Sequence, residues 1–410
     1  MISQFQNSRR RLLLAGALAP TGLLVACGGG EDDAPAAAPT GFTVEPAESG
    51  VIARWNAEPG LTYWVFSAAA ASITRDDFNR FGEARITQPA VSPQFIPGLV
   101  NGRTYSFLVN ATRSGSPAGP ATQSLSAVPR SAGSTWLVGS ALPQDLNALA
   151  FTFSNYVAVG NAGAVATRPV TVDGTWTARS AGVTANLNGV GGVQTLVAVG
   201  DGGTILTAPA NGETWTAQTS GVTTRLNDIV LAPGVFVAVG DGGTVLLSSN
   251  GTAWGPVTSG TSQNLVGVAF TNGVLIALGG NGTLLTSIDG GATWTARSTG
   301  TTATLRHATL CSFASGALYV AVGDNGAVVT SPDLATWTVR NAGSTQNLRR
   351  IAFGSRALAV GAGGTALLTD NGISWTPATT GTTSELRALL RGAFNEYVAV
   401  GSAGANLLSR

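Results

Sequence analysis

The chain has 410 residues, and its composition limits the classes of function that it can have. Only 10% of the residues are charged, all 22 basic residues are arginine, and the formal net charge is +1. The absence of lysine excludes Schiff-base chemistry on a lysine amine. A near-neutral balance without a basic stripe gives no support for nucleic-acid binding.

The first 27 residues have the features of a targeting segment, because three consecutive arginines precede an apolar stretch. That stretch, residues 12–26, is too short for a comfortable membrane-spanning helix and ends in Leu-Val-Ala before Cys27. The end resembles the bacterial lipobox, which implies that Cys27 becomes the lipidated first residue of the mature chain. The arginine run also resembles a twin-arginine signal, so the export route stays open. An ordinary secretory signal that holds a cysteine is the alternative.

The lipobox resemblance implies a protein of the bacterial cell envelope that is attached to the membrane through the lipid on Cys27. Gly28 follows the cysteine, which by the same kind of resemblance favours the outer membrane, on its periplasmic or its surface face. Residues 28–39 are rich in glycine, alanine, proline and acidic residues. This composition predicts a flexible tether.

Residues 40–130 predict a small β-sandwich, because short segments of alternating apolar and polar residues are separated by turn-forming residues. Trp55, Leu99 and Tyr105 stand at positions that resemble the core positions of a fibronectin type III domain. The resemblance implies a spacer module of two packed sheets. It also implies that the hydroxyl of Tyr105 caps a corner of the sandwich.

Residues 134–410 contain an internal repeat of about 40 residues, a period typical of propellers and solenoids. Each repeat has an apolar run that ends in Val-Ala-Val-Gly or a similar sequence, a second glycine three residues later, and a tryptophan. The glycines that end the runs are Gly160, Gly200, Gly240, Gly279, Gly323, Gly361 and Gly401. The tryptophans are Trp136, Trp176, Trp215, Trp254, Trp294, Trp337 and Trp375. Both counts predict seven blades of four short strands, apolar on both faces because each sheet lies between two others.

The two ends of this region predict how the ring closes. Trp136 precedes the first repeat, and the last repeat stops at Arg410 without a tryptophan. Residues 134–140 are therefore expected to supply the outermost strand of the last blade, which removes an exposed sheet edge. The predicted fold is all-β: a seven-bladed β-propeller with an N-terminal fibronectin type III-like β-sandwich.

Residues Ser287–Trp294 match the pattern Ser-x-Asp-x-Gly-x-Thr-Trp in full, and degenerate copies occur in five other repeats. The region therefore resembles Asp-box (BNR) propellers and, among these, the photosystem II assembly/stability factor class. The resemblance implies that the box is a folding element at the outer rim rather than a catalytic one. It also implies that arginines near the channel receive a peptide segment of a partner.

A glycosidase must be considered, because sialidases share this box. Tyr156, Tyr319 and Tyr397 occupy one column of the repeat that also accepts Leu and Phe, which indicates core packing rather than a nucleophile. No carboxylate pair for glycoside hydrolysis is evident. His307 has no convergent metal partners, and Cys311 is expected to be a small buried apolar residue. We therefore predict no catalytic residue, no metal site and no cofactor.

One column of the repeat changes character around the ring. The residue after the leucine that opens each repeat is Asn147, Asn188, Asn227, Val266, Arg306, Arg349 or Arg387. Because the opening strand is innermost, this column is expected to surround one mouth of the central channel. Arg350 adds a further basic residue, and two acids, Asp201 and Asp241, lie near the asparagines.

The predicted ligand-binding residues are Asn188, Asn227, Arg306, Arg349, Arg350 and Arg387. Arginine binds carboxylates through two parallel hydrogen bonds, so the basic side of the mouth is expected to bind an envelope protein or an acidic peptide. Solvated charges at a channel rim are the alternative interpretation of the same residues. The alternative function is a sialidase-like glycoside hydrolase or a carbohydrate-binding protein that uses the loops rich in Ser, Thr and Gly.

Overall fold

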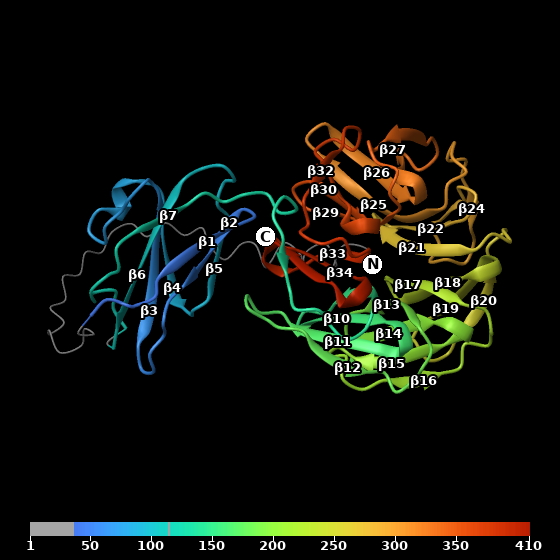
Figure 1. Cartoon of the computed structure of the whole chain (residues 1–410), viewed down its shortest axis with the longest axis horizontal. Helices are drawn as coiled ribbons and strands as arrows, with labels where there is room; N and C mark the ends of the chain where they lie inside the picture. The colour runs from blue at the N-terminus through green and yellow to red at the C-terminus, as the bar shows by residue number, and fades with distance from the viewer. Residues whose placement is uncertain (1–36, 114) are drawn as a thin grey trace.

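The computed structural model describes residues 37–113 and 115–410, and most of the antiparallel sheets in this part are arranged as a ring. A two-sheet sandwich precedes the ring (Figure 1). The all-β prediction is confirmed, since the helical segments are short 3₁₀ turns. Within the described ranges no helix is long and apolar enough to cross a membrane. The predicted signal segment with Cys27, and most of the predicted tether, lie outside the described residues.

The sandwich consists of a three-stranded and a four-stranded antiparallel sheet. The first has the order β1 (Thr43–Ala47), β2 (Gly50–Arg54), β5 (Gln94–Pro97). The second has the order β4 (Gly82–Ala90), β3 (Thr62–Ala69), β6 (Tyr105–Thr112), β7 (Leu125–Ala127), and η2 (Phe78–Arg80) precedes β4. Trp55, Leu99 and Tyr105 all belong to its buried core. The Tyr105 hydroxyl accepts the backbone N–H of Val100 at 3.1 Å, which ties the chain at a corner.

Residues 137–409 form seven four-stranded antiparallel sheets. The innermost strands are β9 (Leu146–Phe151), β13 (Leu187–Gly192), β17 (Leu226–Ala232), β21 (Leu265–Thr271), β25 (Leu305–Phe313), β29 (Leu348–Phe353) and β33 (Leu386–Arg391). The second strands are β10 (Asn155–Gly160), β14 (Thr195–Gly200), β18 (Val235–Gly240), β22 (Val274–Gly279), β26 (Gly316–Gly323), β30 (Ala357–Gly361) and β34 (Tyr397–Gly401). Each innermost strand contacts the next, and β33 contacts β9, so the sheets surround a central channel.

The outer half of each sheet contains a third strand and a short outermost strand. The third strands are β11 (Ala164–Pro169), β15 (Ile205–Pro209), β19 (Thr244–Ser248), β23 (Leu284–Ser287), β27 (Ala327–Ser331), β31 (Ala366–Thr369) and β35 (Asn406–Ser409). The outermost strands are β12 (Thr177–Ser180), β16 (Thr216–Gln218), β20 (Gly255–Thr258), β24 (Thr295–Ala296), β28 (Thr338–Asn341), β32 (Thr376–Ala378) and β8 (Leu137–Val138). Strand β8 pairs with β35, with Val138 opposite Leu407, so one sheet combines segments from both ends of the ring.

Apolar residues on both faces of the second strands hold the ring together. In β10, Val157 and Val159 face one neighbouring sheet and Ala158 faces the other, and all three are fully buried. Complete burial of a valine side chain contributes about 1.5–3 kcal/mol. Because every sheet is covered on both faces, these strands are nearly continuous apolar runs instead of alternating ones.

Two glycines in each repeat serve different purposes at the turn between the second and third strands. Short 3₁₀ turns occupy this place: η3 (Asn161–Gly163), η4 (Asp201–Gly203), η5 (Asp241–Gly243), η6 (Asp324–Gly326), η7 (Ala362–Gly364) and η9 (Ser402–Gly404). The second glycine, for example Gly203, has φ +73°, which favours glycine. The first, Gly200, is extended, and a Cβ there would lie 2.1 Å from the carbonyl oxygen of Asn186. The first glycine is therefore required by the close packing of two backbones and not by a positive φ.

The segment Ser287–Trp294 forms the turn between β23 and β24. The Ser287 hydroxyl accepts the backbone N–H of Gly291 at 2.9 Å. The Asp289 carboxylate accepts the backbone N–H and the hydroxyl of Thr293, at 3.0 and 2.6 Å. These hydrogen bonds lower the pKa of Asp289 to about 2, those from Thr293 most strongly. The carboxylate is fully used inside the turn, which is a structural role.

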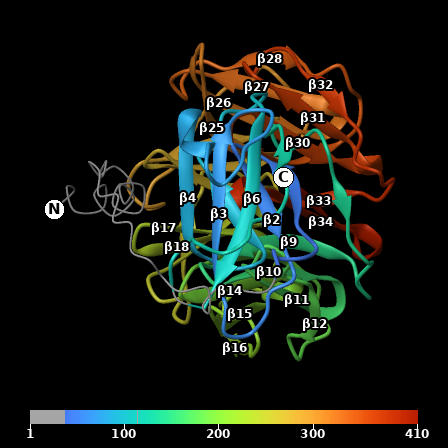
Figure 2. The ribbon, with the colours of Figure 1, turned by 90° about the vertical axis from the view of Figure 1, so that its left-hand side faces the viewer.

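The sandwich is docked against one face of the ring through a buried carboxylate (Figures 1 and 2). Glu48, in the turn between β1 and β2, is 2% exposed. It accepts Nη1 of Arg391 at 2.8 Å and the backbone N–H of Ser355 at 3.2 Å, both in the ring. The aromatic ring of Phe95 packs edge to face on that of Phe394, with centroids 5.7 Å apart. Phe394 lies in the η8 turn (Ala393–Asn395) of the ring of sheets. The sandwich is therefore held in a defined position.

Replacement of Glu48 by alanine is expected to loosen this docking, because it leaves Arg391 partly buried without its counter-ion. Trypsin cleavage after Arg130, in the connection between the two parts, should become roughly tenfold faster or more, since each 1.4 kcal/mol of lost docking energy is a factor of ten. Limited proteolysis followed by mass spectrometry measures this rate. The variant Glu58→Ala removes an exposed glutamate of the sandwich and should cleave like the wild type. Equal rates for Glu48→Ala and Glu58→Ala would contradict the role of Glu48.

Candidate functional site

One mouth of the central channel holds a polar cavity of 560 Å³. The six residues predicted from the sequence as ligand-binding residues all line it: Asn188, Asn227, Arg306, Arg349, Arg350 and Arg387. They lie at or near the start of the innermost strands β13, β17, β25, β29 and β33. We call this cavity with its lining residues the polar mouth. The column of the repeat that changes from asparagine to arginine is thus brought together in space.

The asparagines of the polar mouth connect neighbouring sheets. Nδ2 of Asn188 donates to Oδ1 of Asp201 in the turn of its own sheet and to the carbonyl oxygen of Leu226 in the next sheet, at 2.9 Å each. Asn227 repeats this arrangement one sheet further on, at 2.8 Å for both contacts. Because both N–H groups of these amides are occupied, the two asparagines have mainly a structural role. The Asn188 carbonyl oxygen also accepts Nη2 of Arg225 at 3.0 Å.

Each arginine of the column is paired with a carboxylate of the same mouth. Nε and Nη2 of Arg306 contact the two oxygens of Asp324 at 2.5 and 2.7 Å. Arg349 and Arg387 share Glu385, with shortest contacts of 2.6 and 2.9 Å. Burial raises the pKa of Glu385, but the hydrogen bonds and charges of Arg387 and Arg349 outweigh burial and hold that pKa below its usual value. Glu385 is therefore ionised at neutral pH, and its single charge is shared by Arg349 and Arg387, the second of which also contacts Asp145.

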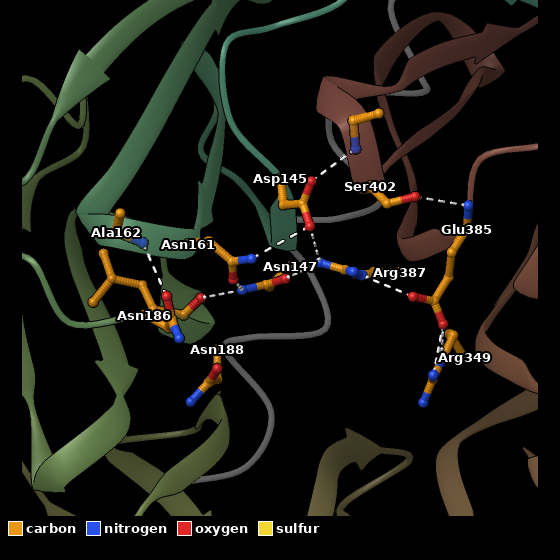
Figure 3. Close-up of polar contacts among 12 residues, drawn as sticks. Asp145, Asn147, Asn161, Ala162, Asn186, Asn188, Arg349, Glu385, Arg387 and Ser402 are labelled. Atoms are coloured by element: carbon orange, nitrogen blue, oxygen red, sulfur yellow. Dashed lines mark hydrogen bonds and ion pairs between the residues drawn. The ribbon is translucent and has the colours of Figure 1, made fainter.

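Arg387 also joins the two ends of the ring (Figure 3). Its Nη1 donates to Oδ2 of Asp145 at 3.0 Å and to Oδ1 of Asn147 at 2.9 Å, both in or beside the first innermost strand. Its Nε bonds Glu385, which precedes the last innermost strand. The guanidinium thus bridges the sheets that lie at the closure.

Arg350, predicted to add a basic group to the mouth, lines the cavity and is paired with an acid. Its two Nη atoms donate to the two carboxylate oxygens of Asp228, at 2.9 Å each. Asp228 also accepts the backbone N–H groups of Ile229 and Val268, at 3.0 and 3.1 Å. Strands β17 and β29, which carry the pair, are three sheets apart, so the ion pair spans the channel. The Asp228 and Arg350 side chains are 3% and 17% exposed.

These pairs show the surroundings of the arginines that were predicted from the sequence to bind an anion. Within the described residues, every arginine of the polar mouth has a carboxylate within 4.0 Å: Arg225 with Asp201, Arg306 with Asp324, Arg349 with Glu385, Arg350 with Asp228, and Arg387 with Glu385 and Asp145. An acidic ligand would have to compete with these carboxylates for the guanidinium groups. The arginine charges of the mouth are compensated inside the ring of sheets.

Beyond the ion pair, the channel contains a second cavity of 480 Å³ on the side of the loops between the first and second strands. Most of its lining residues have apolar side chains, and Asp228, His307 and Arg350 are also among them. Burial, followed by the charge of Arg350, lowers the pKa of His307 well below its usual value, so this histidine is neutral. No group of three or more metal-ligating side chains occurs in the part of the chain that the structure describes.

Comparison with known proteins gives matches to the ring. A family model described as the DUF6242 beta propeller domain matches residues 190–307. A solved structure of YCF48 from Cyanidioschyzon merolae is 16% identical, with a TM-score of 0.54, over 67% of this chain and 98% of that one. A structure of YCF48 bound to D1 peptide is 14% identical, with a TM-score of 0.56, over 67% and 94%. The WD40 beta propeller domain of Doa1 is 12% identical, with a TM-score of 0.55, over 68% and 97%.

The ring is a β-propeller. No curated protein matches the chain. The low identities show the fold alone, and the propeller predicted from the sequence repeats is confirmed at that level.

A tyrosine and a glutamate meet inside the propeller, a pairing that the sequence did not reveal. The Tyr156 hydroxyl donates to Oε1 of Glu396 at 2.8 Å. Nη1 of Arg168 and Nε of Arg410 lie 3.2 Å from the two oxygens of the same carboxylate. All four side chains are 5% exposed or less, and burial, followed by the Glu396 charge, raises the pKa of Tyr156 far above its usual value.

This pair does not form a glycosidase site, although sialidases combine the same residue types. A nucleophilic tyrosine needs access to substrate and a lowered pKa, and Tyr156 has neither. Its column was expected to be core packing. Tyr397, fully buried, and Tyr319, 6% exposed, agree with that expectation, whereas Tyr156 also carries a polar network.

Asp228, which was not predicted from the sequence, belongs to one further column of the repeat. The position after the asparagine-arginine column is Ala148, Gly189, Asp228, Gly267, His307, Arg350 or Ala388. Three ionisable residues in a column of otherwise small ones are a signal that this level of the channel is polar. The carboxylate partners of the arginines were harder to predict from the sequence. Asp324 and Glu385 lie in loops, and the fold decides where those loops run.

Cys311 is expected to be unreactive in the folded protein. It is fully buried in an apolar cluster, and burial raises the pKa of its thiol to about 12. Because the thiolate is the reactive form, the folded protein should not react with a thiol reagent at pH 8, and unfolding in guanidinium should release full reactivity. Labelling of the chain that begins after Cys27, with and without denaturant, measures this. Rapid labelling without denaturant would contradict the buried position.

Proposed function

We propose that the protein is a non-catalytic binding or assembly-scaffold protein whose seven-bladed propeller receives a protein or peptide segment at the polar mouth. The observation that carries this proposal is the convergence of the six predicted residues on one cavity of 560 Å³. Support comes from the shared fold with propellers whose structures include YCF48 bound to D1 peptide and a WD40 domain. In the described residues the arginines of the polar mouth are paired with carboxylates, and Asp228 and His307 deeper in the channel are largely buried.

The polar mouth suits a polypeptide because its donors and acceptors are already positioned. Arg349 and Arg387 hold each other through Glu385, and Asn188 is fixed to two sheets. Preorganised groups lose little conformational entropy when a partner binds. We do not require the segment to be acidic, because the guanidinium groups already have carboxylate partners. A segment that satisfies the remaining N–H groups and carbonyl oxygens fits the mouth better.

We interpret residues 40–130 as a fibronectin type III-like sandwich, and its position supports the approach of a partner from the side of the polar mouth. It is docked through Glu48 against loops such as Ser355 and Asn395, at the opposite end of the channel from the polar mouth. A partner therefore has free access to the polar mouth while the sandwich holds the other face. This gives the module a role in orientation.

A photo-crosslinking residue at the mouth tests the proposal. Arg225, whose side chain is 53% exposed, is replaced by benzoylphenylalanine, and irradiation of cells should give discrete adducts with a protein. The control carries the same residue at Ile288, which is 84% exposed on the outer hairpin. Adducts that form at Ile288 and not at Arg225, or at neither position, would contradict a protein partner at the mouth.

We further propose that the protein is anchored in the bacterial cell envelope through a lipid on Cys27, in the outer membrane by the Gly28 resemblance. The support is the lipobox-like sequence, which lies outside the described residues. Radiolabelled palmitate should label the wild type and not Cys27→Ala, and the variant should leave the membrane fraction. Equal labelling of both proteins would refute the anchor.

A carbohydrate-binding protein is the second candidate, and one observation favours it. Two grooves of 730 and 500 Å³ lie between neighbouring blades, and hydroxyl, amide and charged side chains line them. Thr301 and Thr302 belong to both grooves, and no aromatic residue occurs among their described lining residues. Glycan-array binding and a fluorogenic sialidase assay test this candidate. Turnover that Glu396→Gln abolishes without loss of the fold would overturn the non-catalytic proposal.

A further inference from the structure

The polar mouth has a gap at the fourth sheet. In the sheet before it, Asn227 of the innermost strand is bonded to Asp241 of the turn at 2.8 Å. The corresponding residues of the fourth sheet are Val266 and Gly280, which cannot form such a bond. Val266 lines the cavity and is partly exposed. The ring of polar connections is therefore interrupted by an apolar step.

Asp241, beside this gap, is a carboxylate of the mouth without a cationic partner. Its Oδ1 accepts Nδ2 of Asn227, and its Oδ2 accepts no hydrogen bond from the described residues. Arg225 lies in the loop before the sheet that contains Asp241. Its Nε contacts Asp201 of the preceding sheet, at 3.0 Å. No arginine of the described ranges lies within 4.0 Å of Asp241. The uncompensated charge of the mouth is thus negative.

Two further groups line the same cavity as this carboxylate. The side-chain carbonyl oxygen of Asn227 accepts no hydrogen bond from the described residues, while its two N–H groups bond Asp241 and the backbone carbonyl oxygen of Leu265. Val266, which follows Leu265 in the chain, lines the cavity as well. The site therefore combines an anion, a neutral acceptor and an apolar surface within one cavity.

We propose that this gap is a subsite for a lysine side chain of the partner polypeptide. The inference rests on the proposed function and specifies its partner chemistry. The aliphatic stem of the lysine packs on Val266, and its ammonium donates to Oδ2 of Asp241 and to the carbonyl oxygen of Asn227. Lysine fits better than arginine because a guanidinium fork binds both oxygens of one carboxylate, and Oδ1 of Asp241 is already used by Asn227.

A second copy of this chain cannot provide the group, because the sequence contains no lysine. The partner is therefore a different polypeptide. The subsite also explains why a mouth with several arginines does not require an acidic segment: the arginines are neutralised inside the ring, and the group that remains available attracts a cation.

Methyl NMR with valine labelling tests the subsite in the full chain. The probes are acetylated, amidated pentapeptides of alanine with one central lysine, norleucine, arginine or glutamate. At low ionic strength the lysine peptide should shift the Val266 methyl signals and bind about tenfold more tightly than the norleucine peptide, since a charge-assisted hydrogen bond is worth at least this factor. Asp241→Asn and Val266→Arg should both remove this preference, the second by placing an internal guanidinium on Asp241.

The control Asp76→Asn removes an exposed carboxylate of the sandwich and should bind like the wild type. The inference is overturned if the lysine peptide binds the wild type no better than the norleucine peptide, or if Asp241→Asn leaves the preference unchanged. Crosslinked adducts from position 225 together with either result would retain the proposed function and reject the lysine subsite. Absence of such adducts rejects the proposed function itself.

Discussion

Replacement of Asp228 by alanine is expected to lower the free energy of unfolding of the propeller by about 3–5 kcal/mol, the range for loss of one member of a buried ion pair. The variant leaves the guanidinium of Arg350, 17% exposed, without its counter-ion. It also leaves the backbone N–H groups of Ile229 and Val268 without their acceptor. Guanidinium denaturation followed by tryptophan fluorescence measures the loss.

A double variant separates the charge from the packing in this prediction. Asp228→Leu combined with Arg350→Met removes both charges and keeps apolar volume, and it should recover most of the stability that Asp228→Ala loses. The two backbone N–H groups stay unpaired, so the recovery is incomplete. A double variant as unstable as Asp228→Ala, or a single variant as stable as the wild type, would show that the pair does not brace the channel.

Glu396→Ala is the second variant with a large expected effect, again a loss of about 3–5 kcal/mol. The substitution leaves Arg168 and Arg410, which are 5% and 4% exposed at their side chains, with no carboxylate between them. It also removes the acceptor of the Tyr156 hydroxyl. Because these residues join the first and last sheets, the closure of the ring is expected to open first. Hydrogen exchange should increase most in β8, β10 and β35.

The smaller variant Tyr156→Phe calibrates this result. It keeps the aromatic side-chain ring and the ion pairs of Glu396 and removes one hydrogen bond to a charged group. A loss of about 1.5–3 kcal/mol in the free energy of unfolding is therefore expected. The hydroxyl also accepts the backbone N–H of Ala393 at 2.8 Å, which places the true loss toward the upper end. An effect of Glu396→Ala no larger than that of Tyr156→Phe would mean that the two arginines find other partners or water, and that the carboxylate is not the centre of the network.

Much of the architecture could be predicted because each repeat is defined by short patterns of neighbouring residues. The glycines at the ends of the second strands, such as Gly200, and the tryptophans of the outermost turns recur about every 40 residues. A regular recurrence of apolar runs and turns allows strands, turns and their order to be inferred without tertiary information. The purpose of Gly200 could not be inferred, because its close approach to the backbone before Leu187 arises from pairing across the sheet.

The candidate site was predictable in position and not in charge. Alignment of the repeats places Asn188, Asn227, Arg306 and their neighbours at one level of the innermost strands, and the structure brings them to one cavity. Whether an arginine is free depends on which carboxylate its long side chain reaches. Arg306 reaches the turn of its own blade, whereas Arg350 reaches across the channel to Asp228. No spacing in the sequence encodes the second contact.

The sequence by itself determined the class of fold, the repeat and the column that lines the channel mouth, because these follow from hydrophobic period, turn residues and counting. Only the tertiary structure decided the electrostatics. It paired Arg387 with Asp145 across the closure of the ring and buried Glu48 of the sandwich against Arg391. It left Asp241 without a counter-ion beside Val266. The reason is physical: the energy of a charge depends on its distance to other charges and on its burial, and both are properties of residues that are remote in the chain.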